Sequence, residues 1–108
     1  MPKPMKTAKH TLSSAHVHGA LIIADHCNHR IRRLKNGVVT TLAGDGASGL
    51  RDGPAAVARF AGPANMIFDG EGRLLVADMH DHCVRIVTLE GETTTIGGVD
   101  GPKLDGIP

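Results

Sequence analysis

The stretch that decides the fold is Leu21–Asp25, with the sequence LIIAD, because it returns as LLVAD in Leu74–Asp78. The two aspartates that end these stretches lie 53 positions apart (78 − 25). At the same spacing histidine recurs at positions 29 and 82, arginine recurs at 32 and 85, and Asp52-Gly53 recurs as Asp105-Gly106. A fixed period of this length indicates a repeat architecture, in which similar units stack side by side.

Each unit predicts a four-stranded antiparallel meander in an all-β fold. The continuous aliphatic stretches are typical of strands that are covered on both faces, and Asn36-Gly37 is a strong hairpin signal. We expect strands near residues 20–25, 30–35 and 38–43 in the first unit, and near 65–69, 73–78, 83–88 and 92–97 in the second. Residues 10–15 lack the proline and the apolar alternation of residues 63–68, so the first unit is expected to lack its opening strand.

Units with apolar faces on both sides need similar units beside them, as in the blades of a β-propeller. The chain then divides into a flexible basic N-terminal arm (1–19), a partial first blade (20–44), a glycine-rich linker with an Asp-Gly-Pro turn (45–62), a second blade (63–98) and the start of a linker to a missing third blade (99–108). Within the first linker, Ala55–Arg59 is expected to form one helical turn with Asp52 near its N-cap.

The motifs resemble a known family. IADHCNHRIR at residues 23–32, followed by VTTLAG at 39–44, is similar to an NHL repeat, and the linker residues DGP (52–54) and ARF (58–60) resemble its long-repeat subgroup. Asn65 stands where the family has glycine, and DHCV at residues 81–84 departs from its Asn-His-Arg-Ile. The resemblance implies six-bladed β-propellers, of which this chain would supply an incomplete ring, and it implies a structural packing role for His29 and His82.

Composition limits the possible functions. The 108 residues carry a formal net charge of +1 and no Trp or Tyr, which argues against a nucleic-acid binder that relies on basic patches and stacked aromatics. The longest apolar run, Ala20–Ala24, is far too short to span a membrane, and the N-terminal residues do not form a signal peptide. Two cysteines make no disulfide framework, so Cys27 and Cys83 are expected to be reduced in a cytoplasmic protein.

The turns between the second and third strands are the candidate site. Turns at this position in successive blades emerge on the same face, and here they differ between the units while the strands stay alike, which favours a binding role. The expected partner-binding residues are His26, Cys27, Asn28, His29, Met79, His80, Asp81 and His82. Their His and Cys side chains suit zinc, but Cys27 aligns with His80 and Cys83 with Arg30, so no ligand set repeats and no metal or cofactor is expected.

The remaining aspartates and basic residues near the turns have structural explanations. Asp25 and Asp78 are expected to cap their own turns by accepting backbone N–H groups two or three residues further on. Arg30, Arg32, Arg33 and Lys35 form a basic cluster that is interpreted as a solvated strand face pairing with aspartates.

These observations favour a non-catalytic scaffold that binds another protein, as NHL propellers commonly do. One alternative implied by related propellers is a lyase or lactone hydrolase with a channel metal, for which only Asn65 and Asp69 are candidates. A second alternative is an RNA-binding surface, which the neutral charge disfavours. Open blade faces and unpaired strand edges also predict self-association that completes the ring.

Overall fold

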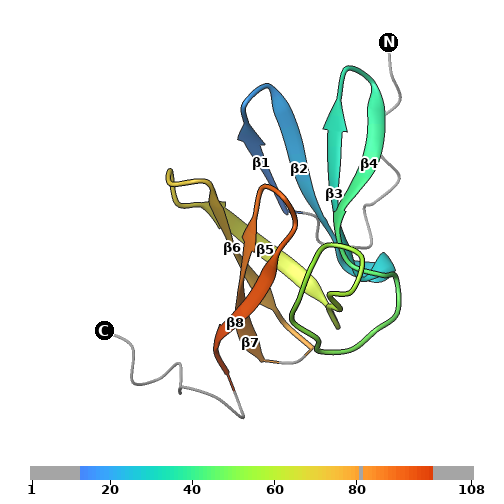
Figure 1. Ribbon diagram of the computed structural model, residues 1–108, viewed down its shortest axis with the longest axis vertical. Coiled ribbons are helices and arrows are strands. Elements are labelled where there is room, and N and C mark those ends of the chain that lie inside the picture. The colour runs from blue at the N-terminus through green and yellow to red at the C-terminus, as the bar shows by residue number, and fades with distance from the viewer. Residues whose placement is uncertain (1–12, 81, 99–108) are drawn as a thin grey trace.

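The computed structural model describes residues 13–80 and 82–98, which form two four-stranded antiparallel sheets (Figure 1). Sheet one contains β1 (Ser13–Val17), β2 (Ala20–Asp25), β3 (Arg30–Lys35) and β4 (Val38–Ala43). Sheet two contains β5 (Pro63–Phe68), β6 (Arg73–Asp78), β7 (Cys83–Thr88) and β8 (Thr93–Gly97). In each sheet the strands are hydrogen-bonded in chain order, as expected of a meander. The predicted all-β architecture of blade-like units in an incomplete ring is confirmed.

The prediction that the first unit lacks its opening strand is wrong. β1 pairs with β2 along its whole length, from Ser13 opposite Ala24 to Val17 opposite Ala20. Its apolar signal is weak because only Ala15 and Val17 point inward, between exposed Ser14 and His16. The first blade therefore begins before residue 20, and residues 13–17 do not belong to an N-terminal arm. Residues 18 and 19 form the turn between β1 and β2, whereas residues 1–12 of the predicted arm and the predicted second linker lie outside the described residues.

The described part of the chain contains one short helix, the 3-10 turn η1 (His26–Asn28). The helical turn expected at Ala55–Arg59 is absent as a helix. Val57 and Ala58 both donate backbone N–H groups to the Pro54 carbonyl, and the chain then leaves this turn. Asp52 does not cap it, because its carboxylate turns toward β8 instead. Among the described residues no helix reaches the length and hydropathy that a membrane crossing requires.

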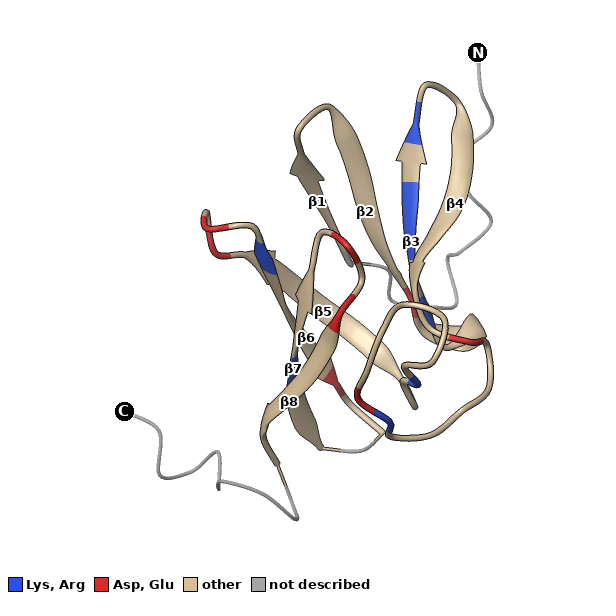
Figure 2. Ribbon diagram, in the orientation of Figure 1, with Lys and Arg blue, Asp and Glu red and all other residues tan. Residues whose placement is uncertain are grey.

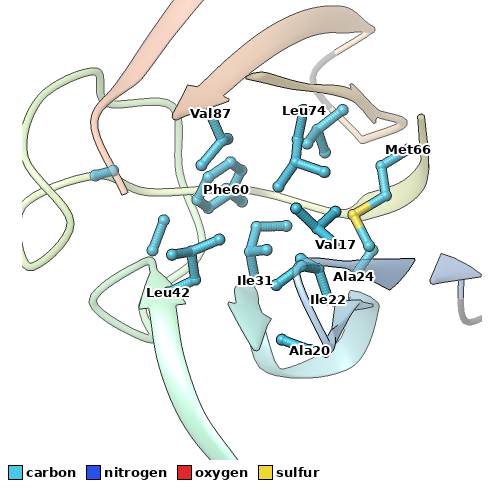
Figure 3. Close-up of a cluster of buried hydrophobic side chains, with 13 residues drawn as sticks. Val17, Ala20, Ile22, Ala24, Ile31, Leu42, Phe60, Met66, Leu74 and Val87 are labelled. Carbon is cyan, nitrogen blue, oxygen red and sulfur yellow. The ribbon is translucent and has the colours of Figure 1, made fainter. Parts of the chain in front are cut away.

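The core lies between the two sheets and includes a linker residue. β1 and β2 of sheet one pack against β5 of sheet two. Figure 3 shows the ring of Phe60, from the linker, between Ile31 of sheet one and Val87 of sheet two. All three of these side chains are fully buried. The linker thus contributes to the core instead of passing over it.

Sheet two is covered on only one of its faces. In sheet two Leu74, Val76 and Val87 are fully buried against sheet one, while Leu75, Ala77, Val84 and Ile86 on the opposite face stay partly exposed. Together with Asn65, Met66 and Ile67, part of this outer face forms an open apolar depression of about 230 Å³. β6 therefore has the composition of a fully buried strand but is half covered within this chain, whereas Ile22, Ile23 and Ala24 of β2 are all buried.

Candidate interaction surface

The two turns singled out in the sequence come together in the structure. η1 of sheet one and the β6–β7 turn of sheet two are adjacent, and the rings of His26 and His80 lie with their centroids 5.0 Å apart. Cys27, Asn28, His80 and His82 are exposed, and Met79 has 55% of its surface exposed. We call the exposed face formed by residues 26–29, 79, 80 and 82 the turn surface. Asp81 was predicted to belong to it but lies outside the described residues.

The floor of the turn surface is the linker dipeptide Ala61-Gly62. The Asp78 carboxylate accepts both of its N–H groups, at 2.9 Å from Ala61 and 2.6 Å from Gly62. His29 Nδ1 lies 2.9 Å from the Ala61 carbonyl oxygen, and the Met79 N–H donates to the Gly62 carbonyl. Residues from both turns therefore hold all four backbone polar groups of this dipeptide, as burial demands.

Gly62 allows the two histidines to approach each other. A Cβ at this position would overlap the His80 ring and would lie 3.1 Å from His26 Nε2. The requirement is steric, because no left-handed backbone conformation is involved at this glycine. Residue 62 was not singled out in the sequence, since only the contact between distant segments reveals its role.

His29 and His82 hold equivalent backbone positions at the ends of the two turns. Both are left-handed, with φ of 57° and 52°, a conformation that most L-residues avoid. His29 also uses its ring on Ala61, as described above, whereas the His82 side chain is exposed. The repeated histidine therefore marks a turn geometry in both units and a side-chain contact in the first.

The predicted turn caps are corrected in detail. Asp25 accepts no backbone N–H in its turn; both of its carboxylate oxygens accept from the Asn28 side-chain amide at 3.1 Å. Asp78 uses its carboxylate on Ala61 and Gly62, which precede it by 17 and 16 residues. The reason is the linker, which runs beside sheet two and brings its own N–H groups to the carboxylate. Local turn rules do not anticipate a partner so distant in sequence.

Beneath the turn surface lies a buried arginine, Arg85, whose role was not predicted from the sequence. The Arg85 side chain is fully buried and binds the linker through both terminal nitrogens. Nη1 donates to the Arg59 carbonyl at 2.8 Å and to Asp78 Oδ2 at 3.3 Å, and Nη2 donates to the Arg51 carbonyl at 2.9 Å and to Asp52 Oδ1 at 3.0 Å. Its guanidinium carbon also lies 4.9 Å from the centre of the Phe60 ring. Such a cation is tolerated in a core because its charge is paired and both terminal nitrogens are hydrogen-bonded, although its buried Nε has no partner.

Asp52 fastens the linker to the edge of sheet two. Its carboxylate accepts from the Thr95 N–H at 3.0 Å and from the Thr95 hydroxyl at 2.8 Å, besides Arg85. Partial burial alone would raise the pKa of Asp52, but the hydrogen bonds from Thr95 and Arg85 outweigh it and hold the pKa below the ordinary 3.8. The next residue, Gly53, exchanges two backbone hydrogen bonds with Thr93 of β8.

The basic cluster on β3 does not pair as expected. Figure 2 shows the basic residues along β3. Among the described residues, none of Arg30, Arg32, Arg33 and Lys35 forms an ion pair. Arg32 has its Nε buried without a hydrogen-bond partner. The ion pairs that do form involve the linker, the β5–β6 turn and the Arg85 cluster, for example Arg59 with Asp45 at 2.7 Å.

The residues considered for catalysis are not gathered into a site. Asn65 is exposed on β5, whereas Asp69 follows that strand and accepts from the Glu71 N–H and from Arg73. The Glu71 N–H and then Arg73 lower the pKa of Asp69 below 3.8, against the opposing effect of burial, so its carboxylate is an ion-paired turn anchor. Within residues 13–80 and 82–98, no three His, Cys, Asp or Glu side chains are placed to hold a metal ion together. Cys27 is exposed, Cys83 is buried, and they form no disulfide.

Comparisons with known proteins place this geometry in context. The chain is 36% identical over 81 residues to Protein SUPPRESSOR OF QUENCHING 1, chloroplastic, of Arabidopsis thaliana, a match that covers 72% of this chain and 8% of that protein. It is 34% identical over 102 residues to NHL repeat-containing protein 2 of Bos taurus, covering 82% of this chain and 14% of that protein. The chain thus spans a small part of the curated relatives it matches. No protein-family model matches the chain.

Solved structures with a similar fold are also found. An auxiliary nutrient binding protein from Bacteroides ovatus superposes with a TM-score of 0.71 and 26% identity, covering 87% of this chain and 27% of the other. A second auxiliary nutrient binding protein, from Bacteroides thetaiotaomicron, gives a TM-score of 0.69 at 21% identity and covers 81% of this chain and 25% of the other. The two-sheet arrangement is therefore a known fold that recurs within larger chains.

Proposed function

We propose that the chain is a non-catalytic, NHL-type propeller segment whose turn surface binds another protein. The observation that carries the proposal is the joining of two turns from different blades over Ala61-Gly62, with His26 and His80 in ring contact. Their exposed neighbours differ in kind: Asn28 carries an amide whose Nδ2 is bound to Asp25, Cys27 carries a thiol whose Sγ lies 3.7 Å from His26 Nδ1, and Met79 carries a thioether. Variable polar and soft apolar side chains on a rigid strand scaffold suit recognition of a protein surface.

The comparisons support the proposal in two ways. The similarity to NHL repeat-containing protein 2 extends over 82% of this chain and agrees with the repeat motifs in the sequence. The Bacteroides ovatus protein of similar fold is named for binding. We extend the proposal to a cytoplasmic location, in which thiols such as Cys27 and Cys83 stay reduced.

The alternatives have weaker support. Asp69, one of two residues considered for a channel metal, already binds Arg73 at 2.6 Å. The basic residues of β3, considered for RNA, lack the stacking aromatics of such a surface: the chain has no Trp or Tyr, Phe60 is buried, and Phe68 is partly buried against the core.

A crosslinking experiment tests the proposal. A photoreactive amino acid at Asn28 is expected to capture a discrete partner, and the same group at exposed Val38, in the β3–β4 turn region, serves as the control for nonspecific capture. Adding Met79→Ala and His80→Ala to the Asn28 crosslinker is expected to abolish the specific product while the circular dichroism spectrum stays unchanged. Equal products from positions 28 and 38, or an unchanged product in the double variant, would show that the turn surface is not the binding site.

A further inference from the structure

Sheet two carries a receptor for the peptide Asp52-Gly53. Arg85 and Thr95, which are register partners on β7 and β8, together give the Asp52 carboxylate three hydrogen bonds. Gly53 pairs with the backbone of Thr93, so the peptide adds to the outer edge of β8. As a result, Thr93 is only 1% exposed even though it lies on the last strand of its sheet.

Sheet one repeats the elements of this receptor, and no peptide from residues 13–80 or 82–98 pairs with them. Arg32 is the register partner of Thr41, as Arg85 is of Thr95, and each pair follows a bulge at the same place in its sheet. Arg85 donates four hydrogen bonds through Nη1 and Nη2, whereas no residue in the described ranges accepts one from the Arg32 guanidinium. The buried Nε is without a partner in both arginines. Val39, which occupies the position of Thr93, is 52% exposed. The same structural elements therefore bind a peptide in sheet two and bind none of the described residues in sheet one.

The chain itself carries a second copy of the missing peptide. Asp105-Gly106 follows the last residue of β8 by eight positions, close to the nine positions by which Asp52-Gly53 follows β4. A carboxylate followed by glycine supplies the charge for an arginine and a backbone that can approach a strand edge closely. The sequence therefore contains a second Asp-Gly peptide of the kind that the receptor on sheet two binds.

The receptor lies on the face of sheet one that points away from sheet two. Ile22, Ala24 and Ile31 of sheet one belong to the core against sheet two, so the alternating positions Ile23 and Arg32 lie on the opposite face. On sheet two, Leu75, Ala77 and Val84 correspond to Ile22, Ala24 and Ile31 at the 53-residue spacing and form the uncovered outer face. The interface between the sheets is therefore available a second time, between the outer face of sheet two in one copy and the outer face of sheet one in another.

We propose that a second copy of this chain docks head to tail on sheet one and places its Asp105-Gly106 on Arg32 and Thr41. The contact is heterologous, because one copy contributes the receptor and the other contributes the peptide. The guanidinium of Arg32 and the hydroxyl of Thr41 bind the Asp105 carboxylate, and Gly106 pairs with the edge of β4 at Val39.

Sedimentation velocity of the full chain over a range of concentrations tests this proposal. The wild type is expected to associate with rising concentration, and Arg32→Ala or Asp105→Ala is expected to weaken association about tenfold or more, as loss of a charged hydrogen bond does. Lys35→Ala on the same strand and Asp100→Ala in the same terminal segment are matched controls that should associate as the wild type does. Circular dichroism checks that each variant keeps its strand content.

A mixing experiment tests the direction of the contact. The Arg32→Ala chain keeps a normal peptide, and the Asp105→Ala chain keeps a normal receptor. An equimolar mixture of the two is therefore expected to form dimers, whereas each variant alone stays monomeric at the same concentration. A synthetic peptide of residues 98–108 should compete with wild-type association, and the same peptide with Asp105→Ala should not. A concentration-independent monomer, association that survives both variants, or a greater loss with Asp100→Ala than with Asp105→Ala would overturn the proposal. Because Asp105→Ala changes no described contact, the test holds even where Arg32→Ala fails to fold.

Discussion

Asp78 and Arg85 face each other on neighbouring strands of sheet two, with both side chains fully buried and 3.3 Å between Oδ2 and Nη1. Neither side chain makes all of its hydrogen bonds with the other. Asp78 also holds Ala61 and Gly62, and Arg85 also holds Arg51, Asp52 and Arg59, so the pair joins the sheet to the whole linker. Buried charges of this kind stabilise a fold only while every member is present.

Removing the cation should therefore be costly. Arg85→Ala leaves Asp78 buried without its charged partner, and we expect the free energy of unfolding to fall by about 3–5 kcal/mol. Urea denaturation followed by circular dichroism measures this loss. Arg32→Ala is the matched control, because Arg32 occupies the same position in sheet one without a hydrogen bond to the described residues, and it should change stability by about 0.5 kcal/mol at low protein concentration. Equal losses in the two variants would contradict the proposed linker-holding role of Arg85.

Gly62→Ala should disturb the turn surface. The added methyl group overlaps the His80 ring and approaches His26, so we expect a loss of about 1–3 kcal/mol and altered imidazole resonances for both histidines in NMR spectra. The double variant Gly62→Ala, His80→Ala removes the obstructing ring and should recover most of this stability. If the double variant is no more stable than Gly62→Ala, crowding against His80 is not the cause.

The left-handed turn positions should tolerate asparagine but not valine. His82 has φ of 52° and an exposed side chain, so His82→Asn should leave stability within about 0.5 kcal/mol, while His82→Val should lose about 1–2 kcal/mol through steric strain. Thermal unfolding compares the two variants directly. At His29 both substitutions should cost more than at His82, because the ring contact with Ala61 is also lost.

The linker should loosen in acid. The pKa of Asp45 is held below 3.8 chiefly by its hydrogen bond from Arg59, and that of Asp52 by Thr95 and Arg85 against the opposing effect of burial. A carboxylate whose pKa is lower in the folded state stabilises the fold above its unfolded pKa, and this stabilisation disappears as pH falls through the lower folded value. We therefore expect the contribution of Asp45 and Asp52 to the melting temperature to stay constant with pH near neutrality, and the melting temperature to fall below a pH of about 4.

Asp52→Asn provides the control for this acid transition. The variant should be less stable than the wild type at neutral pH and should show a shallower decline below a pH of about 4, because one of the titrating groups has been removed. Parallel declines in wild type and variant would assign the acid sensitivity to other carboxylates.

The sequence predicted the strands well where periodicity and turns agreed. The prediction near residues 73–78 matches β6, and Asn36-Gly37 forms the expected tight turn with φ of 52° and 77°. β1 was missed because small residues such as Ala15 give little hydrophobic signal. Its hydrogen bonding to β2 is what makes this segment a strand. Strand position depends on tertiary pairing where the local pattern is weak.

The position of the candidate site was predictable from the sequence, but the hydrogen bonds between its turns and the linker were not. The adjacency of the two turns followed from the repeat, and the contact between His26 and His80 agrees with it. The roles of Gly62 and Arg85 depend on the path of the linker, which no local pattern specifies. The recurrence of arginine at positions 32 and 85 and of Asp-Gly at 52 and 105 was visible in the sequence, and it becomes meaningful only once one pair is seen in contact.

The linker bound to sheet two also bears on where the chain can be cut. Residues 51–62 are bound to sheet two by Arg85, Thr93 and Asp78. They also bind the chain before residue 46, because Gly44 and Asp45 donate backbone N–H groups to the Ala55 and Ala58 carbonyls and His29 Nδ1 lies 2.9 Å from the Ala61 carbonyl oxygen. Covalent continuity through the exposed Ala47–Ser48 stretch is therefore not what keeps the two sheets together. A chain nicked there should stay assembled under native conditions and separate only in denaturant, which makes this stretch the natural place for the new ends of a circularly permuted protein.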